Sequence, residues 1–226
     1  MSVTRRAAIV GAVSVLAAPR LARADADADA GAAREPHVEV DAAALAALLA
    51  EVAKARRAVK TLTASFKQER VIALLATRVR STGKLVMVGP DRLRWELAPP
   101  DRIIYWITPD GIAYRTPRSS AALPPSGQSA KVAQALADVR AMIGGDLHTL
   151  EKRYTLSASR GATEVTFKGA AREPTTRVRS FEVTTAKDLV RPVRARIVEG
   201  KRDATEIVFE GVKINETVDP ALVRPS

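Results

Sequence analysis

Residues 81–97 read STGKLVMVGPDRLRWEL, and this stretch decides the fold. Leu85 and Met87 occupy every second position before a Gly-Pro-Asp turn, and Leu93, Trp95 and Leu97 do so after it. Apolar residues at every second position are typical of a strand with one buried and one wet face. A tight turn between two such runs predicts an antiparallel pair.

The same period of two extends through residues 61–116, where short segments are broken by Gly or Pro. Strand-like segments resume after a helical middle part and are expected at Tyr154–Ala158, Thr163–Lys168, Val178–Thr184, Val190–Glu199 and Ala204–Ile214. Helical spacing of apolar residues predicts one helix over residues 41–60, N-capped by Asp41, and another over residues 129–143. About ten strands, two helices and no βαβ alternation predict a mainly β, α+β domain. We expect one curved antiparallel sheet with helices covering one face.

The N-terminal 24 residues have the form of an export signal, with basic residues, an apolar run and a small-residue end at Ala24. Arg5 and Arg6 slightly favour the twin-arginine route over the general one. The apolar run is about a dozen residues, short of the ~20 that span a bilayer. We therefore predict cleavage after Ala24, a disordered linker over residues 25–37 and one domain over residues 38–226 of a periplasmic protein.

Composition excludes several functions. The chain has no cysteine and two histidines, which rules out disulfides, thiol catalysis and a three-histidine metal site. The net charge of +11 falls to +7 without the signal, which holds four arginines and no acid. Export and the scatter of basic residues argue against nucleic acid as a partner. The basic charge could instead serve to bind anionic lipid head groups or acidic partner surfaces, or it could simply be solvated.

Candidate catalytic groups are isolated in the sequence. His37 and His148 have no ligand spacing around them, and the loop serines Ser119, Ser120 and Ser126 lack a nucleophile elbow. Glu96 alternates with Trp95 and is expected to face solvent, away from an apolar site. We predict no catalytic residue, no metal and no cofactor.

Several segments in order resemble the periplasmic outer-membrane lipoprotein carrier (LolA-like) family. The resemblance is carried by TASFKQ at 63–68, STGKL at 81–85, GPDRLRWE at 89–96 with Pro99-Pro100, the Asp110-Gly111 turn, and TEIVF at 205–209 leading to VKIN at 212–215. It covers nearly all of residues 41–219. The match is to a divergent branch, some of whose members accompany lipid-linked or polyene biosynthesis.

The resemblance implies a half-open β-barrel, closed by helices, whose apolar interior shields acyl chains of lipoproteins between the inner and outer membranes. It further implies a releasing transporter in the inner membrane and an acceptor in the outer membrane, with a monomeric carrier between them. Carriers of the family usually place a basic residue before the Pro of this motif, where it helps to latch the lid. Gly89 stands there in this chain, so a latch through that position is absent.

The expected acyl cavity is lined by Phe66, Leu85, Met87, Leu93, Trp95, Ile104, Trp106, Met142 and Ile143. Ordinary core packing is the alternative for each of them. Within residues 103–108 either strand parity is apolar enough to face the cavity. Two functions remain open: a carrier of lipoproteins or a related amphiphile such as a polyene product, and a sensing module that binds a lipid or peptide.

Overall fold

The computed structural model describes residues 37–73, 76–123, 127–200 and 202–225, with residues 127–132 described by their backbone alone. The strands are β1 (Val38–Glu39), β2 (Thr61–Ile72), β3 (Thr77–Val88), β4 (Arg92–Leu97), β5 (Ile103–Thr108), β6 (Gly111–Arg115), β7 (Ser120–Ala122), β8 (Tyr154–Arg160), β9 (Glu164–Ala171), β10 (Val178–Ala186), β11 (Pro192–Glu199) and β12 (Asp203–Ile214). The helices are α1 (Ala42–Arg57), α2 (Gly127–Gly144), α3 (Leu147–Glu151) and the 3-10 helix η2 (Pro220–Val223).

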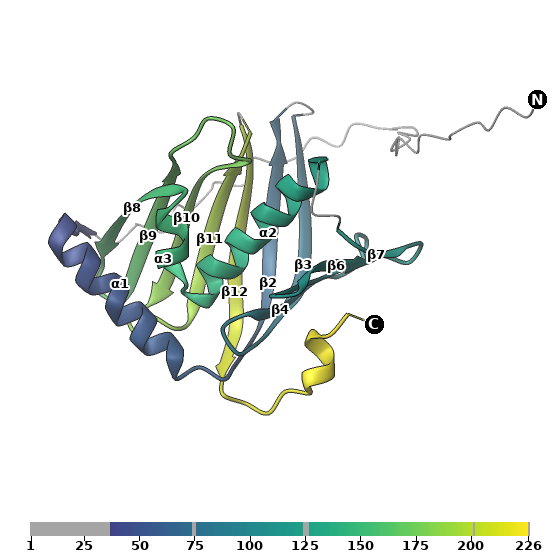
Figure 1. Ribbon diagram of the computed structural model, residues 1–226, viewed down its shortest axis with the longest axis horizontal. Coiled ribbons are helices and arrows are strands. Elements are labelled where there is room, and N and C mark those ends of the chain that lie inside the picture. Colours follow the sequence, from purple (N-terminus) through teal and green to yellow (C-terminus); the bar gives the residue numbers. More distant parts are fainter. Residues whose placement is uncertain (1–36, 74–75, 124–126, 201, 226) are drawn as a thin grey trace, which may run out of the picture. The chain divides into compact units, whose positions relative to one another are not determined.

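All twelve of these strands belong to one antiparallel sheet in the order β1-β8-β9-β10-β11-β12-β2-β3-β4-β5-β6-β7. The edge strands β1 and β7 do not pair with each other, so the described sheet stays open. Figure 1 shows α2 and α3 crossing one face of this sheet. The predicted fold, mainly β and half-open with helices over one face, is confirmed. The predicted export signal and residues 25–36 of the linker lie outside the described residues.

Strand register places the apolar residues of neighbouring strands in rows. Ala64 of β2 is opposite Leu85 of β3, and Leu85 is opposite Trp95 of β4. Trp95 is in turn opposite Tyr105 of β5. Directly opposite residues point to the same side of a sheet. We call the face that carries Trp95 the covered face, because α2 packs on it, and the other face the outer face.

Gly83 explains why one strand position lacks a side chain. A Cβ atom built on Gly83 would lie 2.3 Å from Cζ of the Phe66 ring and 2.2 Å from the backbone oxygen of Glu96. The Phe66 ring therefore lies across β3 at this point and stacks on Trp95, with ring centroids 4.2 Å apart. This close packing fills the middle of the covered face.

Helix α1 begins where the sequence predicts. The Asp41 carboxylate accepts a hydrogen bond from the backbone N–H of Ala44 at 2.8 Å, which is the arrangement of an N-cap. Leu48 and Val52 are buried on the inner side of the helix. The helix contacts β8 and α3, so it closes the β8 end of the core.

Two strands were not predicted. β7 lies between the strand-like residues 61–116 and the helix expected over residues 129–143, and β1 has only two residues. Every residue of both strands is exposed. A fully exposed strand needs no apolar alternation, so the sequence carries no period-two signal there.

Candidate functional site

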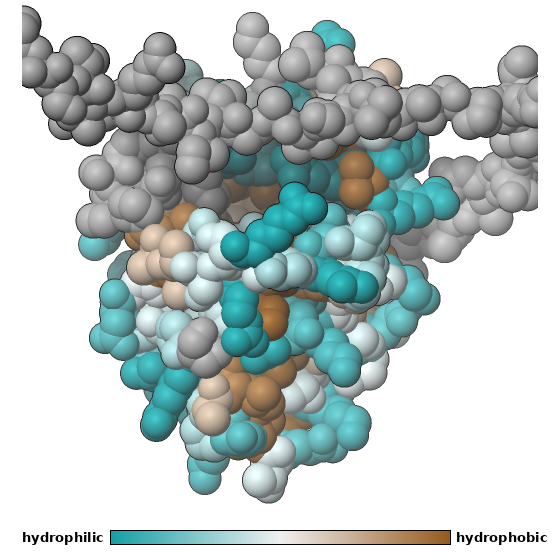
Figure 2. All heavy atoms as spheres, turned by 90° about the vertical axis from the view of Figure 1, so that its right-hand side faces the viewer, coloured by the Kyte–Doolittle hydropathy of each residue, from teal (hydrophilic) through white to brown (hydrophobic). Residues whose placement is uncertain are grey.

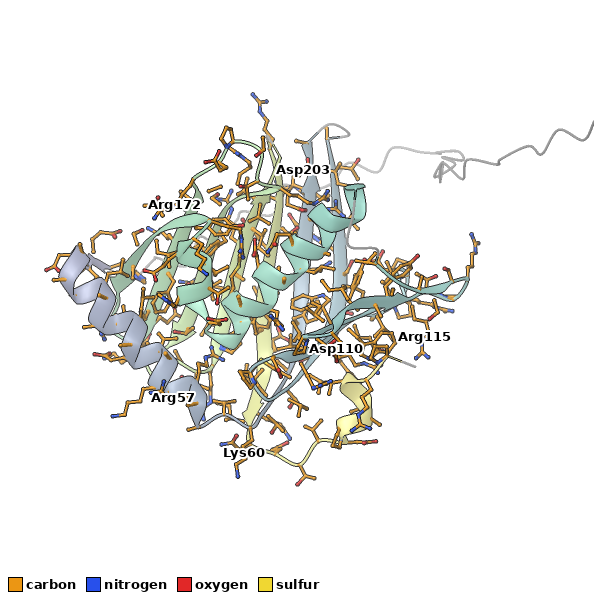
Figure 3. The ribbon with its side chains drawn as sticks, in the orientation of Figure 1. Arg57, Lys60, Asp110, Arg115, Arg172 and Asp203 are labelled. Atoms are coloured by element: carbon orange, nitrogen blue, oxygen red, sulfur yellow. The ribbon has the colours of Figure 1, made fainter. Side chains whose placement is uncertain are left out.

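A cavity of about 220 Å³ lies between the covered face and α2. Helix α2 contacts β5 and β10, so it bridges the two arms of the sheet above this space. The cavity is nearer the end of β12 that carries Asp203 than the end near Lys60, because Thr205 lines it (Figure 3). The residues that line it are Gln68, Arg70, Trp95, Leu97, Tyr105, Ile107, Ala135, Leu136, Val139, Arg177, Val178, Ile197, Glu199, Thr205 and Ile207.

The wall of the cavity is apolar and its rim is polar. Trp95, Ile107 and Ile207 form part of the wall on the sheet side, and Leu136 and Val139 of α2 face them. The polar residues come from strand ends and from the chain just before β10. Such a chamber offers hydrocarbon a dry surface.

Three aromatic rings support this wall. Phe66, Trp95 and Phe209 form a cluster in which Phe209 lies edge-on to both of the others, at 6.4 Å from Phe66 and 6.3 Å from Trp95. All three rings are buried. Edge-to-face aromatic packing adds to the free energy of burial, so this part of the wall is expected to be rigid.

The nine predicted cavity residues divide into one that lines the cavity, six that are packed in the core and two, Ile104 and Trp106, on the other face of the sheet. Trp95 lines the cavity, whereas Phe66, Leu85, Met87 and Leu93 lie on the same face but are packed, with 0 to 2% of their surface exposed. Met142 and Ile143 are likewise buried, at the C-terminal end of α2. Contact of these packed residues with a ligand stays a prediction.

Ile104 and Trp106 were placed in the cavity wrongly. Trp106 is opposite Arg94 of β4, and Arg94 follows the parity of the outer face. The indole Nε1 of Trp106 donates a hydrogen bond to the backbone oxygen of Leu222 at 3.0 Å. Helix η2 therefore buries Trp106 from the outer side, which explains why both parities of β5 are apolar.

Two arginines of the outer face contact the ring of Trp106 near η2. The guanidinium carbons of Arg94 and Arg115 lie 5.6 and 5.3 Å from the centre of the Trp106 ring, within the range of a cation–π contact. Seen from the side of β7 and the C-terminus, hydrophobic residues reach the surface in patches among hydrophilic ones (Figure 2). Leu222, which is 39% exposed, contributes to the apolar surface.

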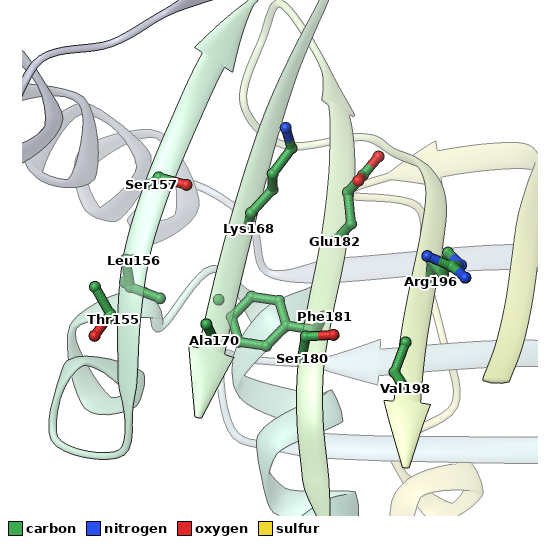
Figure 4. Close-up of a pocket in the computed structure, with 11 residues that line it drawn as sticks. Thr155, Leu156, Ser157, Lys168, Ala170, Ser180, Phe181, Glu182, Arg196 and Val198 are labelled. Carbon is green, nitrogen blue, oxygen red and sulfur yellow. The ribbon is translucent and has the colours of Figure 1, made fainter. Parts of the chain in front are cut away.

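A second hollow, on the outer side of β8 to β11, is of another kind (Figure 4). It has about 380 Å³, and Lys168, Glu182 and Arg196 lie side by side on neighbouring strands there. Lys168 and Arg196 also reach Glu39 and Glu206, at 3.5 and 3.3 Å. Basic and acidic side chains are thus neighbours on adjacent strands, as is typical of a sheet surface exposed to solvent.

Helix α2 is fixed to the sheet through its C-terminal half. The guanidinium of Arg140 donates to the backbone oxygen of Asp91, in the β3–β4 turn, at 2.9 Å. Gly89 of this turn has a φ of 63°, a conformation that costs other L-residues about 1–2 kcal/mol. The helix thus supplies the basic side chain and the turn supplies the acceptor.

Asp138 is the second anchor of α2. Its carboxylate is 1% exposed and accepts a hydrogen bond from the hydroxyl of Tyr154 at 2.6 Å, and it also pairs with Arg153. Burial raises the pKa of Tyr154, and the hydrogen bond to Asp138 raises it further. The phenol therefore stays protonated and donates at neutral pH.

Sequence reasoning missed most of the cavity wall. Tyr105 and Ile107 could have been assigned from the parity of Trp95 and Leu93, because they are their cross-strand partners. Ile197 lies in a strand without a motif, and Ile207 belongs to the TEIVF segment of the resemblance but was not assigned to the cavity. Within the described residues, no group of three His, Cys, Asp or Glu side chains could hold a metal ion. None of the described helices is both long and apolar enough to cross a membrane.

An open antiparallel sheet that holds an apolar chamber under a helix defines a binding protein for apolar groups. The sequence matches the family described as outer membrane lipoprotein carrier protein LolA over residues 57–225. This match covers most of the chain, so the protein belongs to the LolA family. The family is named for carrying lipoproteins, and its fold supports a lipid- or lipoprotein-binding function of the carrier type.

The solved structures that this chain matches have low sequence identity to it. The LolA superfamily protein NE2245 from Nitrosomonas europaea is 9% identical, with 79% of this chain and 97% of that chain covered and a TM-score of 0.43. The lipoprotein LppX from Mycobacterium tuberculosis is 15% identical, with 77% and 98% covered and a TM-score of 0.39.

The Pseudomonas aeruginosa MucA/MucB complex is also 15% identical, with a TM-score of 0.39. The alignment covers 79% of this chain but only 59% of that one. A search of curated proteins found no match.

Proposed function

We propose that this protein is a periplasmic carrier that shields the acyl chains of a lipoprotein, or of a related amphiphile, during transfer from the inner to the outer membrane. The observation that carries the proposal is the apolar cavity between Trp95 of the sheet and Leu136 and Val139 of α2. Burial of an acyl chain is favourable by ~0.8 kcal/mol per CH₂. Membership of the LolA family supports the same function.

The size of the cavity implies that α2 moves when cargo enters. Pockets that hold drug-sized ligands usually have about 300–1,000 Å³, more than the 220 Å³ found here. A neighbouring hollow of about 270 Å³ shares Ala135, Arg177 and Val178 with the cavity. Asp138 and Arg140 anchor the C-terminal half of α2, so we expect the N-terminal half to lift and join the two spaces.

The predicted export signal supports a periplasmic location for this function. A carrier there would receive cargo from a releasing transporter in the inner membrane and deliver it to an acceptor in the outer membrane, as a monomer. It requires no nucleic acid, cofactor or catalytic group. The export route is tested by changing Arg5 and Arg6 to Lys, which should reduce periplasmic yield if the twin-arginine route is used. Undiminished export would contradict that route and leave the periplasmic location standing.

The test of cargo binding compares two valines on opposite sides of the sheet. Val139 lines the cavity from α2, whereas Val208 is 49% exposed on the outer face of β12. An unpaired carboxylate against hydrocarbon costs several kcal/mol. Val139→Glu should therefore weaken binding of a fluorescent lipopeptide by at least about thirtyfold, while Val208→Glu binds like the wild type.

Thermal melts of both variants are recorded beside the titration, because Val139→Glu must remain folded for the comparison to count. A folded wild type that binds no acylated probe at micromolar concentration would contradict the carrier function. Binding of a non-acylated peptide alone would favour a sensing module of the same fold.

A further inference from the structure

We infer that the cavity selects an amphiphile with an anionic head group, which Arg70 and Tyr105 bind at the rim while the hydrocarbon chain fills the cavity. This inference rests on the proposed function and narrows its cargo. The head group is a carboxylate or a phosphate, as in a fatty acid or an acidic lipid product.

Register places Arg70 at the rim of the cavity. Arg70 is opposite Thr205 of β12 and Val79 of β3, and it has the same parity as Phe66. Its side chain belongs to the covered face and lines the cavity beside Gln68 and Tyr105. A cation at the border of an apolar chamber suits a ligand with one charged end and one apolar end.

The charge of Arg70 is not neutralised by its neighbours. Within the described part of the chain, Arg70 has no ion pair with a carboxylate, whereas Arg177, the other rim cation, pairs with Glu199 at 2.7 Å. Glu69 points to the outer face, where Arg78 and Arg80 bind it at 2.7 and 2.9 Å. The residues that line the cavity therefore carry one uncompensated positive charge.

Asp101 is an acidic group that acts electrostatically on Tyr105, although it does not line the cavity. Its carboxylate accepts a short hydrogen bond of 2.5 Å from the hydroxyl of Ser81. Both Arg70 and Asp101 act electrostatically on Tyr105, and their effects oppose each other. Asp101 is thus held by Ser81 and does not form an ion pair with Arg70.

Tyr105 supplies a hydrogen-bond donor next to this charge. Its ring is half-buried in the cavity wall, opposite Trp95. Burial raises the pKa of Tyr105 above its usual value, so the hydroxyl keeps its proton at neutral pH. A guanidinium with two parallel N–H donors and a neighbouring O–H matches a carboxylate or phosphate. A neutral acyl chain would make no use of either group.

The experiment compares ligands with one chain and different heads. Dodecanoate, dodecyl phosphate, dodecanol and inorganic phosphate each compete with an apolar fluorophore for the cavity, below their micelle concentrations. We expect both anionic amphiphiles to bind about tenfold more tightly than dodecanol, as for one charge-assisted hydrogen-bonded contact. Inorganic phosphate without a chain should not compete, and added salt should reduce the preference.

Variants assign the preference to Arg70. Arg70→Gln should lower the affinity for both anions relative to dodecanol until the preference for the anions is lost. Arg70→Lys should retain part of the preference, and Tyr105→Phe should reduce it. Arg57→Gln is the matched control, because Arg57 is also exposed but lies at the end of α1, away from Asp203 and the cavity rim (Figure 3).

Each outcome decides one of the two claims. Equal wild-type affinity for dodecanol and the anions would overturn the head-group inference and leave the carrier function intact. A preference that survives Arg70→Gln would overturn the assignment to Arg70. Competition by inorganic phosphate alone would show a site for free anions instead of amphiphiles. Failure of every chain-bearing ligand to bind would overturn the proposed function itself.

Discussion

The guanidinium of Arg140 on α2 donates a hydrogen bond to the backbone oxygen of Asp91 in the β3–β4 turn, over 2.9 Å. Position 89 is Gly, so the turn supplies no basic residue as a latch. Helix α2 contacts the turn all the same, but here the helix supplies the basic residue and the turn supplies the acceptor. Gly144 also packs on this turn, since a Cβ there would lie 3.2 Å from the oxygen of Pro90. The turn therefore holds the C-terminal half of α2.

Arg140→Met should loosen this end of α2 and keep most of the aliphatic packing of the arginine side chain. We expect a loss of about 1 kcal/mol in the free energy of unfolding, the usual value of one such hydrogen bond. Hydrogen exchange of the α2 amides should become faster, and so should uptake of a fluorescent lipid. Arg57→Met is the control. Unchanged exchange in α2 would show that the Arg140 contact does not restrain the helix.

The second anchor of α2 predicts an effect of alkaline pH. Tyr154 keeps its proton in the folded protein because burial and the Asp138 carboxylate raise its pKa. In the unfolded chain the phenol ionises near its usual pKa of about 10. Above that pH the folded state binds more protons than the unfolded state, so stability falls as pH rises. Below about pH 9 this contribution is constant.

Tyr154→Phe should therefore lose less stability than the wild type between about pH 9 and pH 11, by up to 1.36 kcal/mol per pH unit. At neutral pH the variant is less stable by about 1–3 kcal/mol, because the buried Asp138 loses a donor. Arg56, whose pKa burial lowers to about 10, acts in the opposite direction, but it is present in both proteins. Urea unfolding at several pH values measures the difference, and parallel curves would contradict the prediction.

The packing of Phe66 over Gly83 predicts a strong effect of a single methyl group. Gly83→Ala places a Cβ within 2.3 Å of the Phe66 ring, so the ring or the strand must shift. Overpacking of this kind costs about 1–3 kcal/mol. Thr82→Ala, at the neighbouring exposed position, is the control for the change of strand propensity. Equal melting temperatures for the two variants would mean that the Phe66 ring is free to move away.

The sequence predicted the fold better than the cavity, and β5 shows why. Alternation assigns Leu93 and Trp95 to one face because their neighbours are charged. In β5 both parities are apolar, and the choice depends on register with β4 and on Leu222, which is 116 residues away from Trp106. Such distant contacts leave no local pattern. Arg70 was missed for a similar reason, since a strand-end arginine resembles any solvated one until its cross-strand neighbours are known.

The two tryptophans make the last prediction testable by fluorescence, because Trp95 lines the cavity and Trp106 lies under η2 on the outer face. Val223 is 1% exposed and holds η2 against the sheet. Val223→Asp buries a charge in this contact and should detach the segment, which removes the Leu222 oxygen from Trp106 and shifts its emission to the red. The response of Trp95 to a bound acyl chain should persist.

Leu222→Asp is the control for this experiment, because Leu222 is 39% exposed and its hydrogen bond to Trp106 uses the backbone oxygen, which the substitution retains. It should leave the emission of the free protein unchanged. If Val223→Asp instead abolished the blue shift that we expect cargo to produce at Trp95, the C-terminal segment and the cavity would be coupled across β4 and β5. The outer-face assignment of Trp106 would then have to include a role in cargo binding.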